Sequence, residues 1–526
     1  MADTDTQEQA AADQAVEVDV PAFLEKVKQQ VAAHEAAPKT GSFKRFHYKT
    51  VQELRDQIAE EGLSIELSDD LSPLLKPRKV GMRTASNSMA ILPMEGCDSN
   101  PDGSPSDMTR RRYLRFAAGG SALSWWEANT VVPEGKANPI AMMITADNLG
   151  SFADLVAETK RVAKAKNGVD LLNIIQLTHS GRYSRPVDKP ASMVAFRDPI
   201  LDARTGVVSD DQVVTDTYLD ELTGKYVQAA LNAQKAGFDG VDIKAVHKYL
   251  VSELLGGFTR EGRYGGPKLE NRARFLLQTV KAVREACGPD FIVASRMNVF
   301  DVHPYPYGFG VDKDDFFTWD PTEPKQLVKM LVDEGVDLLG LSSSNPYYIY
   351  PQWGRPFDAA PVGVPLPDDS QLKIVETCFH YVSTLQAVAG DVPIVGNEYT
   401  WLRNFWPNAG AANLAAGRAG FVGQGRSSFA YPDAAHDIMT NGGMDPKKCC
   451  VACSRCTQIM RDHGSTGCVI KDNKMILPIY KAGRDLAKAR EAGDAEAVAA
   501  AEKAVEAAHQ RAYDMATEQV KELEQA

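Results

Sequence analysis

The stretch YLDELTGKYVQAALNAQKAGFDGVDI (residues 218–243) contains a helix, a turn and a buried strand in direct succession. Apolar residues recur at helical spacing over 218–236, and a glycine then separates this helix from the short apolar run 240–243. A helix that leads directly into a short, fully apolar strand is typical of sheets with parallel strands, which are buried on both faces.

The same rhythm of apolar run, loop and helix recurs from about residue 85 onward. Further helical segments include 155–165 and 271–286. The apolar runs are 89–94, 122–128, 171–177, 240–243, 291–297, 338–341, 392–396 and 419–423. Eight strands that alternate with helices close most simply into a (β/α)8 TIM barrel. A doubly wound sheet is the structural alternative, but eight roughly equal repeats fit it less well.

The rest of the chain divides around this barrel. We expect an acidic, flexible N-terminal tail with a short helix, the barrel, a cysteine-rich segment and a C-terminal helical extension. Their predicted bounds are 1–40 for the tail, 41–440 for the barrel, 441–476 for the cysteine-rich segment and 477–526 for the helices. The Ala-Gly-Asp at 492–494 should divide the extension into two helices. These helices could pack on the barrel or on a second subunit of a homo-oligomer.

Charge and hydropathy exclude several classes of protein. The 526 residues include 58 Lys and Arg against 70 Asp and Glu, a net charge of −12. A broad nucleic-acid or anionic-membrane surface needs an excess of positive charge, and the Arg110–Arg112 triplet is too short to supply one. No apolar run approaches the ~18 residues of a membrane span, and the N-terminus has no export signal. We therefore expect a cytoplasmic protein.

Cysteines are concentrated in one short stretch. Cys450, Cys453 and Cys456 are spaced by three residues, and Cys468 follows after eleven more. Tetrahedral zinc sites usually pair their ligands two and two, whereas three close cysteines and a distant fourth are typical of [4Fe–4S] clusters. Zinc and a metal-free loop remain the alternatives, and Cys449 leaves the choice of the first ligand open.

A series of short motifs precedes the cysteines. They are LPM at 92–94, DGSPS at 102–106, EANTVVPEG at 127–135, QLTHSGR at 176–182, HKYL at 247–250, RYGG at 263–266, ENR at 270–272 and GQGR at 423–426. Each is weak alone, but in this order they are specific. With these motifs the chain resembles the Old Yellow Enzyme family of FMN-dependent reductases over roughly residues 70–470. More narrowly, it is similar to the iron–sulfur branch that includes 2,4-dienoyl-CoA reductase, trimethylamine dehydrogenase and bile-acid-type enoate reductases.

The resemblance implies that FMN binds at the C-terminal end of the barrel. Pro93, Met94 and Ala128 would line the isoalloxazine ring. The remaining flavin contacts would come from Gln176 at the pyrimidine edge, Arg296 near N1, and Gly396, Gly425 and Arg426 at the phosphate. A cation near N1 favours the anionic reduced flavin. The resemblance also implies that Cys450, Cys453, Cys456 and Cys468 bind the [4Fe–4S] cluster.

The resemblance further implies that Tyr249 is the proton donor. Hydride would pass from flavin N5 to the β-carbon of an unsaturated carbonyl compound, and Tyr249 would protonate the α-carbon. Lys244 and His247 stand where the family has a His and a second His or Asn that bind the carbonyl oxygen, so the lysine is a departure. A second departure is Glu95, where the family commonly has Thr or Cys. Sequence leaves open the roles of Glu95, Cys97, His179 and Arg182.

We therefore expect an FMN- and [4Fe–4S]-dependent ene-reductase acting on a small unsaturated carbonyl compound or thioester. Aromatic residues in the loops 300–310 and 345–354 predict a pocket for a flat molecule. No G-x-G-x-x-G follows a strand, so electrons would come from a separate flavoprotein or ferredoxin, or directly from NAD(P)H. The alternatives are an amine or O-demethylating dehydrogenase like trimethylamine dehydrogenase, a non-redox barrel with structural zinc, and an electron-transfer subunit without substrate turnover.

Overall fold

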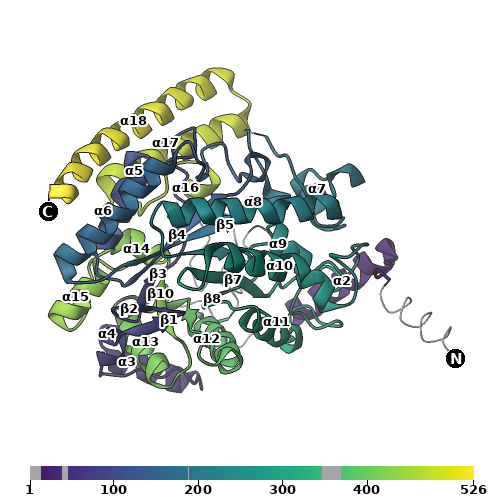
Figure 1. Ribbon diagram of the computed structural model, residues 1–526, viewed down its shortest axis with the longest axis horizontal. Helices are drawn as coiled ribbons and strands as arrows, with labels where there is room; N and C mark the ends of the chain where they lie inside the picture. Colours follow the sequence, from purple (N-terminus) through teal and green to yellow (C-terminus); the bar gives the residue numbers. More distant parts are fainter. Residues whose placement is uncertain (1–13, 38–45, 188, 346, 348–368, 526) are drawn as a thin grey trace.

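The computed structural model describes residues 14–37, 46–187, 189–345, 347 and 369–525. At its centre, eight parallel strands form a closed barrel in the order β10-β3-β4-β5-β6-β7-β8-β9 (Figure 1). The strands are β3 (Met89–Ile91), β4 (Leu123–Thr130), β5 (Leu172–Thr178), β6 (Gly240–Ile243), β7 (Ile292–Phe300), β8 (Leu338–Ser343), β9 (Ile394–Gly396) and β10 (Phe421–Gln424). Each overlaps one of the apolar runs, and the predicted (β/α)8 barrel is confirmed.

A helix follows every barrel strand and covers the outside of the barrel. In chain order these are α5 (Asp107–Ala118), α6 (Leu149–Asn167), α8 (Asp216–Lys235), α10 (Leu269–Cys287), α11 (Thr322–Asp333), α12 (Gln371–Ala389), α13 (Trp406–Ala415) and α14 (Arg426–Ala430). The stretch that predicted the fold forms α8 and β6, with Gly237 at a φ of 86° in the turn between them. Only glycine adopts this φ without strain.

Strand β4 shows why the apolar runs are continuous. All of its residues are buried, because one face points into the barrel and the other packs under helices. Trp125 points inward and donates a hydrogen bond from Nε1 to Asp242 at 3.0 Å. Trp126 points outward, donates to Asn173 at 2.9 Å and stacks on Tyr113 of α5 with 3.9 Å between ring centroids.

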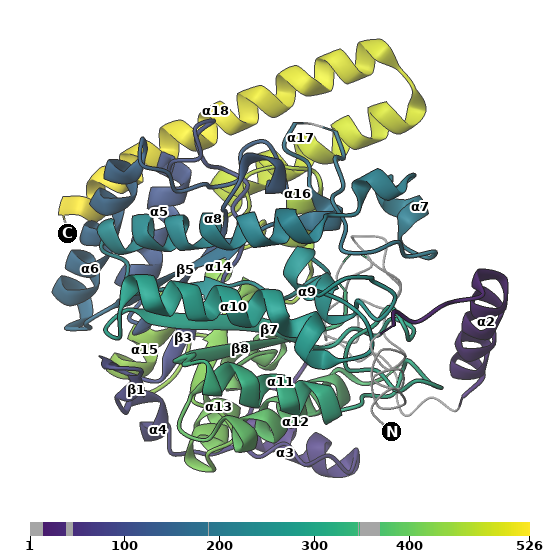
Figure 2. The ribbon, with the colours of Figure 1, turned by 45° about the vertical axis from the view of Figure 1, so that its right-hand side comes forward.

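The N-terminal region adds elements that the sequence did not predict in full. Helix α2 (Val20–Ala36) lies at the side of the barrel, where Phe23 contacts the ring of Tyr307 (Figure 2). Before the first barrel strand come α3 (Val51–Glu60), α4 (Ser72–Leu75) and the hairpin of β1 (Arg78–Val80) and β2 (Arg83–Ala85). Residues 1–13 and 38–40 of the predicted tail lie outside the described residues. The predicted domain bounds stay predictions.

The C-terminal region packs on the same chain's barrel. Helix α16 (Arg455–Arg461) is followed by α17 (Asn473–Ala492) and the long α18 (Ala495–Gln525), which form a hairpin across one side of the molecule (Figures 1 and 2). Ala512, Ala516 and Val520 of α18 are buried, and α18 packs against α5. In the part of the chain that the structure describes, no helix combines the length and apolarity that crossing a membrane requires.

The three consecutive arginines of α5 form ion pairs that connect this helix to the C-terminal region and to the barrel. Arg110 pairs with Glu524 of α18 at 2.7 Å, and Arg111 pairs with Asp472 at 2.8 Å. Arg112 is buried and pairs at 2.6 Å with both Asp98 and Glu127, which are also buried. The triplet is therefore committed to intramolecular ion pairs.

Replacing Arg112 by Met should destabilise the fold severely. The substitution leaves Asp98 and Glu127 as buried carboxylates without their cation, which costs about 3–5 kcal/mol. Urea denaturation measures the loss. The control is Arg490→Met, which removes an exposed pair with Glu502 and should cost less than about 1 kcal/mol. Equal losses in the two variants would contradict the assigned role of the Arg112 pair.

Candidate active site

A cavity of about 470 Å³ lies over the C-terminal ends of the barrel strands. Many of the lining residues lie in the strands or in the loops that follow them. These are Pro93, Met94, Glu95, Cys97, Ala128, Gln176, Lys244, His247, Tyr249, Arg296, Ser342, Glu398 and Arg426. In (β/α)8 enzymes this end of the barrel holds the active site. The cavity is therefore the candidate active site.

The lining brings together all three predicted catalytic residues and most of the predicted cofactor residues. Gly396 and Gly425 are the exceptions, because neither lines the cavity. A Cβ added to Gly396 would lie 3.0 Å from the hydroxyl oxygen of Tyr399, so a side chain at this position would have to displace the Tyr399 ring slightly. Gly425 directly precedes Arg426, which does line the cavity. The proposed part of both glycines in phosphate binding stays a prediction.

Asp242 of β6 organises the floor of the cavity. One carboxylate oxygen accepts hydrogen bonds from Gln176 Nε2 at 2.6 Å and Trp125 Nε1 at 3.0 Å, and the other accepts from the Arg296 backbone N–H at 2.7 Å. Burial raises the pKa of Asp242 to about 6, and these donors oppose the rise. Because Gln176 Nε2 is committed to Asp242, the amide oxygen of Gln176 is the atom left for a donor in the cavity. The neighbouring Arg296 side chain is half-buried, and its desolvation lowers its pKa.

Tyr249, Lys244 and Glu95 meet in the lining of the same cavity. The Lys244 ammonium lies over the Tyr249 ring, with Nζ 3.8 Å from the centroid. Glu95 Oε1 is 3.5 Å from Lys244 Nζ and 3.4 Å from the Tyr249 hydroxyl. Burial lowers the pKa of Lys244 to about 8 against the opposing effect of Glu95, and burial with Glu95 holds the pKa of Tyr249 well above 10. The group offers a protonated phenol and, at neutral pH, a cation.

A cluster of tyrosine rings forms one wall beside this group. Tyr347 packs against Tyr183 with 4.4 Å between centroids, and its hydroxyl is 3.2 Å from that of Tyr249. Residues 346 and 348–354 of the predicted aromatic loop lie outside the described residues. Tyr307 of the other aromatic loop does not line this cavity and contacts Phe23 and Phe196 instead. Tyr183 was not predicted.

The loop that delivers Tyr249 to the cavity has a strained backbone. His247 and Lys248 have φ values of 70° and 56°, which side-chain-bearing residues rarely adopt. Lys248 is buried and held by Asp301 at 2.8 Å, so tertiary contacts impose this conformation. His247 lines the cavity with Tyr249, and the two rings meet edge to face at 6.2 Å.

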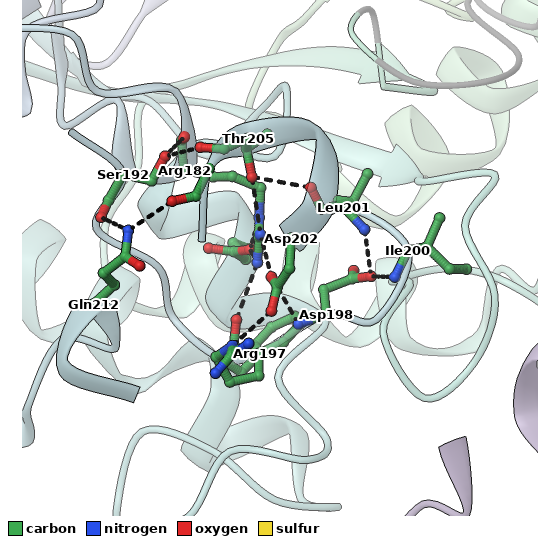
Figure 3. Close-up of polar contacts among 12 residues, drawn as sticks. Arg182, Ser192, Arg197, Asp198, Ile200, Leu201, Asp202, Thr205 and Gln212 are labelled. Carbon is green, nitrogen blue, oxygen red and sulfur yellow. Dashed lines mark hydrogen bonds and ion pairs between the residues drawn. The ribbon is translucent and has the colours of Figure 1, made fainter. Parts of the chain in front are cut away.

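Arg182 and His179, whose roles the sequence left open, are tied to the protein. Arg182 donates to Glu253 at 2.6 Å and Asp202 at 2.7 Å, and Figure 3 shows it at the centre of polar contacts within the segment 182–212. This segment includes α7 (Asp202–Thr205) and borders the cavity. His179 accepts from the Gly181 N–H at 3.0 Å through Nδ1, so its protonated Nε2 donates to Tyr218 at 2.9 Å. His179 does not line the cavity.

Helix α16 supplies a wall that the sequence did not predict. Met460, Arg461 and His463, at and after its C-terminal end, line the main cavity. No local pattern marks these residues, because their position depends on how the cysteine segment folds over the barrel. Asp242, by contrast, stands out in the sequence as a charged residue within an apolar run.

The four predicted cluster cysteines lie around one small cavity. Cys450, Cys453, Cys456 and Cys468 all line it, together with Arg426. Burial and the neighbouring Cys456 raise the pKa of Cys450 to about 12. Cys449 lies apart, with its thiol 3.4 Å from the Asp445 carbonyl oxygen.

The described residues contain no group of three or more His, Cys, Asp or Glu side chains placed to hold a metal ion. Each thiolate of a [4Fe–4S] site binds a different iron, so its ligands stand further apart than those of a single ion. The iron–sulfur cluster therefore stays a prediction.

Comparisons with known proteins identify the barrel. Residues 73–319 match the sequence profile of the NADH:flavin oxidoreductase / NADH oxidase family, an oxidoreductase family that uses FMN. The match covers just under half of the chain, and this part of the barrel is similar to that family. The chain is 27% identical over 276 residues to an NADH oxidase from Thermoanaerobacter brockii, and 28% identical over 355 residues to an NADPH dehydrogenase from Geobacillus thermodenitrificans. These matches cover 51% and 65% of this chain, and 39% and 94% of the respective relatives.

Among solved structures, a 2-naphthoyl-CoA reductase in complex with 2-naphthoyl-CoA shares the fold with a TM-score of 0.61 at 20% identity. That match covers 76% of this chain and 57% of the reductase. The chain thus spans well under two thirds of the length of both this structure and the NADH oxidase. At this identity the likeness concerns the fold alone.

The residues of the cavity fit FMN. The free amide oxygen of Gln176 matches the N–H of a flavin pyrimidine ring, because the amide nitrogen is held by Asp242. The half-buried cation of Arg296 also lines the cavity and would stabilise the negative charge of a reduced flavin. Arg426, another lining residue, provides a guanidinium for a phosphate.

Proposed function

We propose that this chain is an FMN- and [4Fe–4S]-dependent ene-reductase that reduces a C=C bond conjugated to a carbonyl or thioester group. The observation that carries the proposal is the pairing of Tyr249 with Lys244, which places a phenol and a cation side by side in the lining of the main cavity. Because its residues fit FMN, we call this main cavity the flavin-type cavity. Reduction of such a bond requires a proton donor for the α-carbon and positive charge at the carbonyl oxygen.

FMN would be held by Gln176, Arg296 and Arg426, with Pro93, Met94 and Ala128 against the ring. When bound, it supplies the hydride. The protein's own contribution is to orient the flavin through the Asp242-bound amide of Gln176 and to place positive charge from Arg296 beside it.

Tyr249 would protonate the substrate. Its raised pKa keeps the phenol protonated at neutral pH, so the proton is present when it is needed. Lys244 would polarise the carbonyl as an ammonium group, with His247 as its neighbour in the lining. Desolvation strengthens this polarisation, since Lys244 is 2% exposed.

Amine oxidation is the second candidate, and the tyrosine wall favours it. Three tyrosine rings, Tyr183, Tyr249 and Tyr347, lie close together as in aromatic sites for cations. However, the Lys244 ammonium already occupies the face of the Tyr249 ring at 3.8 Å. A cationic substrate would be repelled by Lys244, so the geometry favours a neutral or anionic carbonyl compound.

For the cysteine segment, we propose a [4Fe–4S] cluster on Cys450, Cys453, Cys456 and Cys468 that passes electrons to FMN. Arg426 lines both the cysteine cavity and the flavin-type cavity, which supports direct contact between the two sites. Val451 is 41% exposed beside the first cysteine, so a partner can approach. The electron donor would be a separate flavoprotein or ferredoxin, or NAD(P)H acting directly on FMN.

Replacing Tyr249 by Phe tests the reductase function. The variant keeps the ring but loses the proton, so the rate of C=C reduction should fall by about 100-fold with unchanged flavin content. The control is Tyr226→Phe, which removes a buried hydroxyl that does not line the cavity and should leave the rate unchanged. An unchanged rate in Tyr249→Phe would instead support an electron-transfer subunit, and oxidation of amines by the wild type would support the second candidate.

The pH dependence of kcat/KM tests Lys244. The folded protein holds its pKa near 8, below the ordinary value of 10.5, so the ammonium is present below this pH and lost above it. Reduction should therefore slow as the pH rises through about 8. Lys244→Arg keeps its charge and should extend the plateau to higher pH, whereas Lys244→Met should be slow at all pH values. If kcat/KM declined at the same pH in the wild type and in Lys244→Arg, the decline would have to come from the titration of a group other than Lys244.

Metal analysis of Cys453→Ala tests the cluster. The anaerobically purified wild type should hold about four iron atoms per chain and the variant should lose them, with FMN retained in both. Cys378→Ala is the control, because Cys378 is a buried cysteine of α12 outside the segment. Zinc in the wild type, or full iron in Cys453→Ala, would refute the proposed ligand set.

A further inference from the structure

A second, much smaller cavity lies directly behind the candidate active site; we name it the Asn138 cavity. Its lining residues are Glu95, Cys97, Glu127, Ala128, Thr130, Ala137, Asn138, Ala141, Met142, Thr178 and Ser180. Glu95, Cys97, Ala128, Ala137 and Asn138 also line the main cavity. These shared residues form the wall between the two spaces.

Three buried polar atoms of the Asn138 cavity have no hydrogen-bond partner among the described residues. They are Asn138 Oδ1, Thr178 Oγ1 and Ser180 Oγ. Their residues are 4%, 2% and 0% exposed, respectively. A buried polar atom without a partner costs about 1–3 kcal/mol, so three around one cavity indicate a bound molecule that satisfies them.

The size and chemistry of the cavity fit one water molecule. A volume of about 10 Å³ is open to the centre of a water-sized sphere, which is about what a single water needs. Two hydroxyl groups and an amide oxygen supply both donors and acceptors, as a buried water requires. A metal ion fits less well, because the described residues contain no group of three or more His, Cys, Asp or Glu side chains placed to hold one.

Glu95 connects this cavity to Tyr249. Its Oε1 lies 3.4 Å from the Tyr249 hydroxyl, and the residue lines both cavities. The other carboxylate of the Asn138 cavity is committed elsewhere, since Glu127 accepts from Arg112 and from the Gly96 N–H, each at 2.6 Å. Glu95 is therefore the carboxyl group able to exchange a proton between the cavity and Tyr249.

We propose that a water molecule bound by Asn138, Thr178 and Ser180 forms, with Glu95, a relay that returns a proton to Tyr249 after each turnover. This inference rests on the proposed function, in which Tyr249 gives its phenolic proton to the substrate. A proton from solvent then passes through this water to the Glu95 carboxylate, which accepts it and releases it to the Tyr249 phenolate. Glu95 is a carboxylate again at the end, and the water regains its proton from solvent through the main cavity. One solvent proton is consumed per turnover and no electrons move.

A crystal structure of the FMN-loaded wild type, compared with three variants, tests the water site. We expect an ordered water within hydrogen-bond distance of Asn138, Thr178 and Ser180. Thr178→Val should lose it, and Thr178→Ser should keep it. The matched control is Thr279→Val, because Thr279 is a buried threonine of α10 whose hydroxyl also has no partner. A wild-type cavity without water would overturn the inference, whatever reaction the protein catalyses.

Rapid kinetics test the relay itself. In Thr178→Val the first turnover should keep the wild-type rate, because Tyr249 starts protonated. Steady-state kcat should then fall about tenfold, with a larger solvent deuterium isotope effect and unchanged KM, as one link of the proton supply is lost. Thr178→Ser should restore kcat and Thr279→Val should match the wild type. Equal slowing of the first and later turnovers would reduce Thr178 to a structural role and overturn the relay.

The two proposals can fail separately. A wild type that holds FMN and reduces no unsaturated carbonyl compound would refute the proposed function and the relay, while the crystal structures would still decide the water site. A wild type that reduces such compounds but shows no burst in Thr178→Val would refute the relay alone.

Discussion

The carboxylate of Asp242 lies fully buried inside the barrel, and it has to be satisfied by the protein. Its partners come from strands β4, β5 and β7, so one side chain of β6 ties together a large part of the barrel interior. Without these donors the charge would be too costly to bury. The same bonds fix the Gln176 amide and the backbone at Arg296. The need to satisfy the buried Asp242 carboxylate therefore also positions residues at the floor of the flavin-type cavity.

A second constraint acts in the wall of that cavity. The chain carries a net charge of −12, yet Lys244 and Arg296 bring positive charge into the lining. Lys244 is stabilised there by the Tyr249 ring and by Glu95, and both contacts are specific to this geometry. In the proposed function, this arrangement disfavours cationic substrates and stabilises negative charge that develops on an oxygen. The two departures from the family pattern, Lys244 and Glu95, thus act as a pair.

Sequence predicted the barrel well because its strands are buried on both faces and therefore read as short apolar runs. It also placed Gln176, Tyr249 and Arg296 correctly at the cavity, since strand ends of a barrel converge. It could not predict the stacking of Lys244 on Tyr249, which depends on the positive-φ turn at His247 and Lys248.

Contacts between segments that are distant in the chain also could not be predicted from the sequence. The wall from α16 depends on tertiary packing, and the buried network of Arg182 depends on the fold of the segment 182–212. In the same way, Tyr307 belongs to an aromatic-rich loop and yet packs beside α2 rather than in the cavity. Composition alone does not distinguish such a structural aromatic residue from one that contacts a substrate.

The most direct test of the account is a single-turnover experiment without any electron donor. The protein is purified anaerobically, its flavin is reduced with dithionite, the excess is removed and 2-cyclohexenone is added. The account predicts that the flavin is reoxidised and that about one equivalent of cyclohexanone forms per flavin, since FMN passes two electrons to one C=C bond. A flavin that stays reduced in the presence of the enone, while the oxidised protein is reduced by a simple tertiary amine, would contradict it.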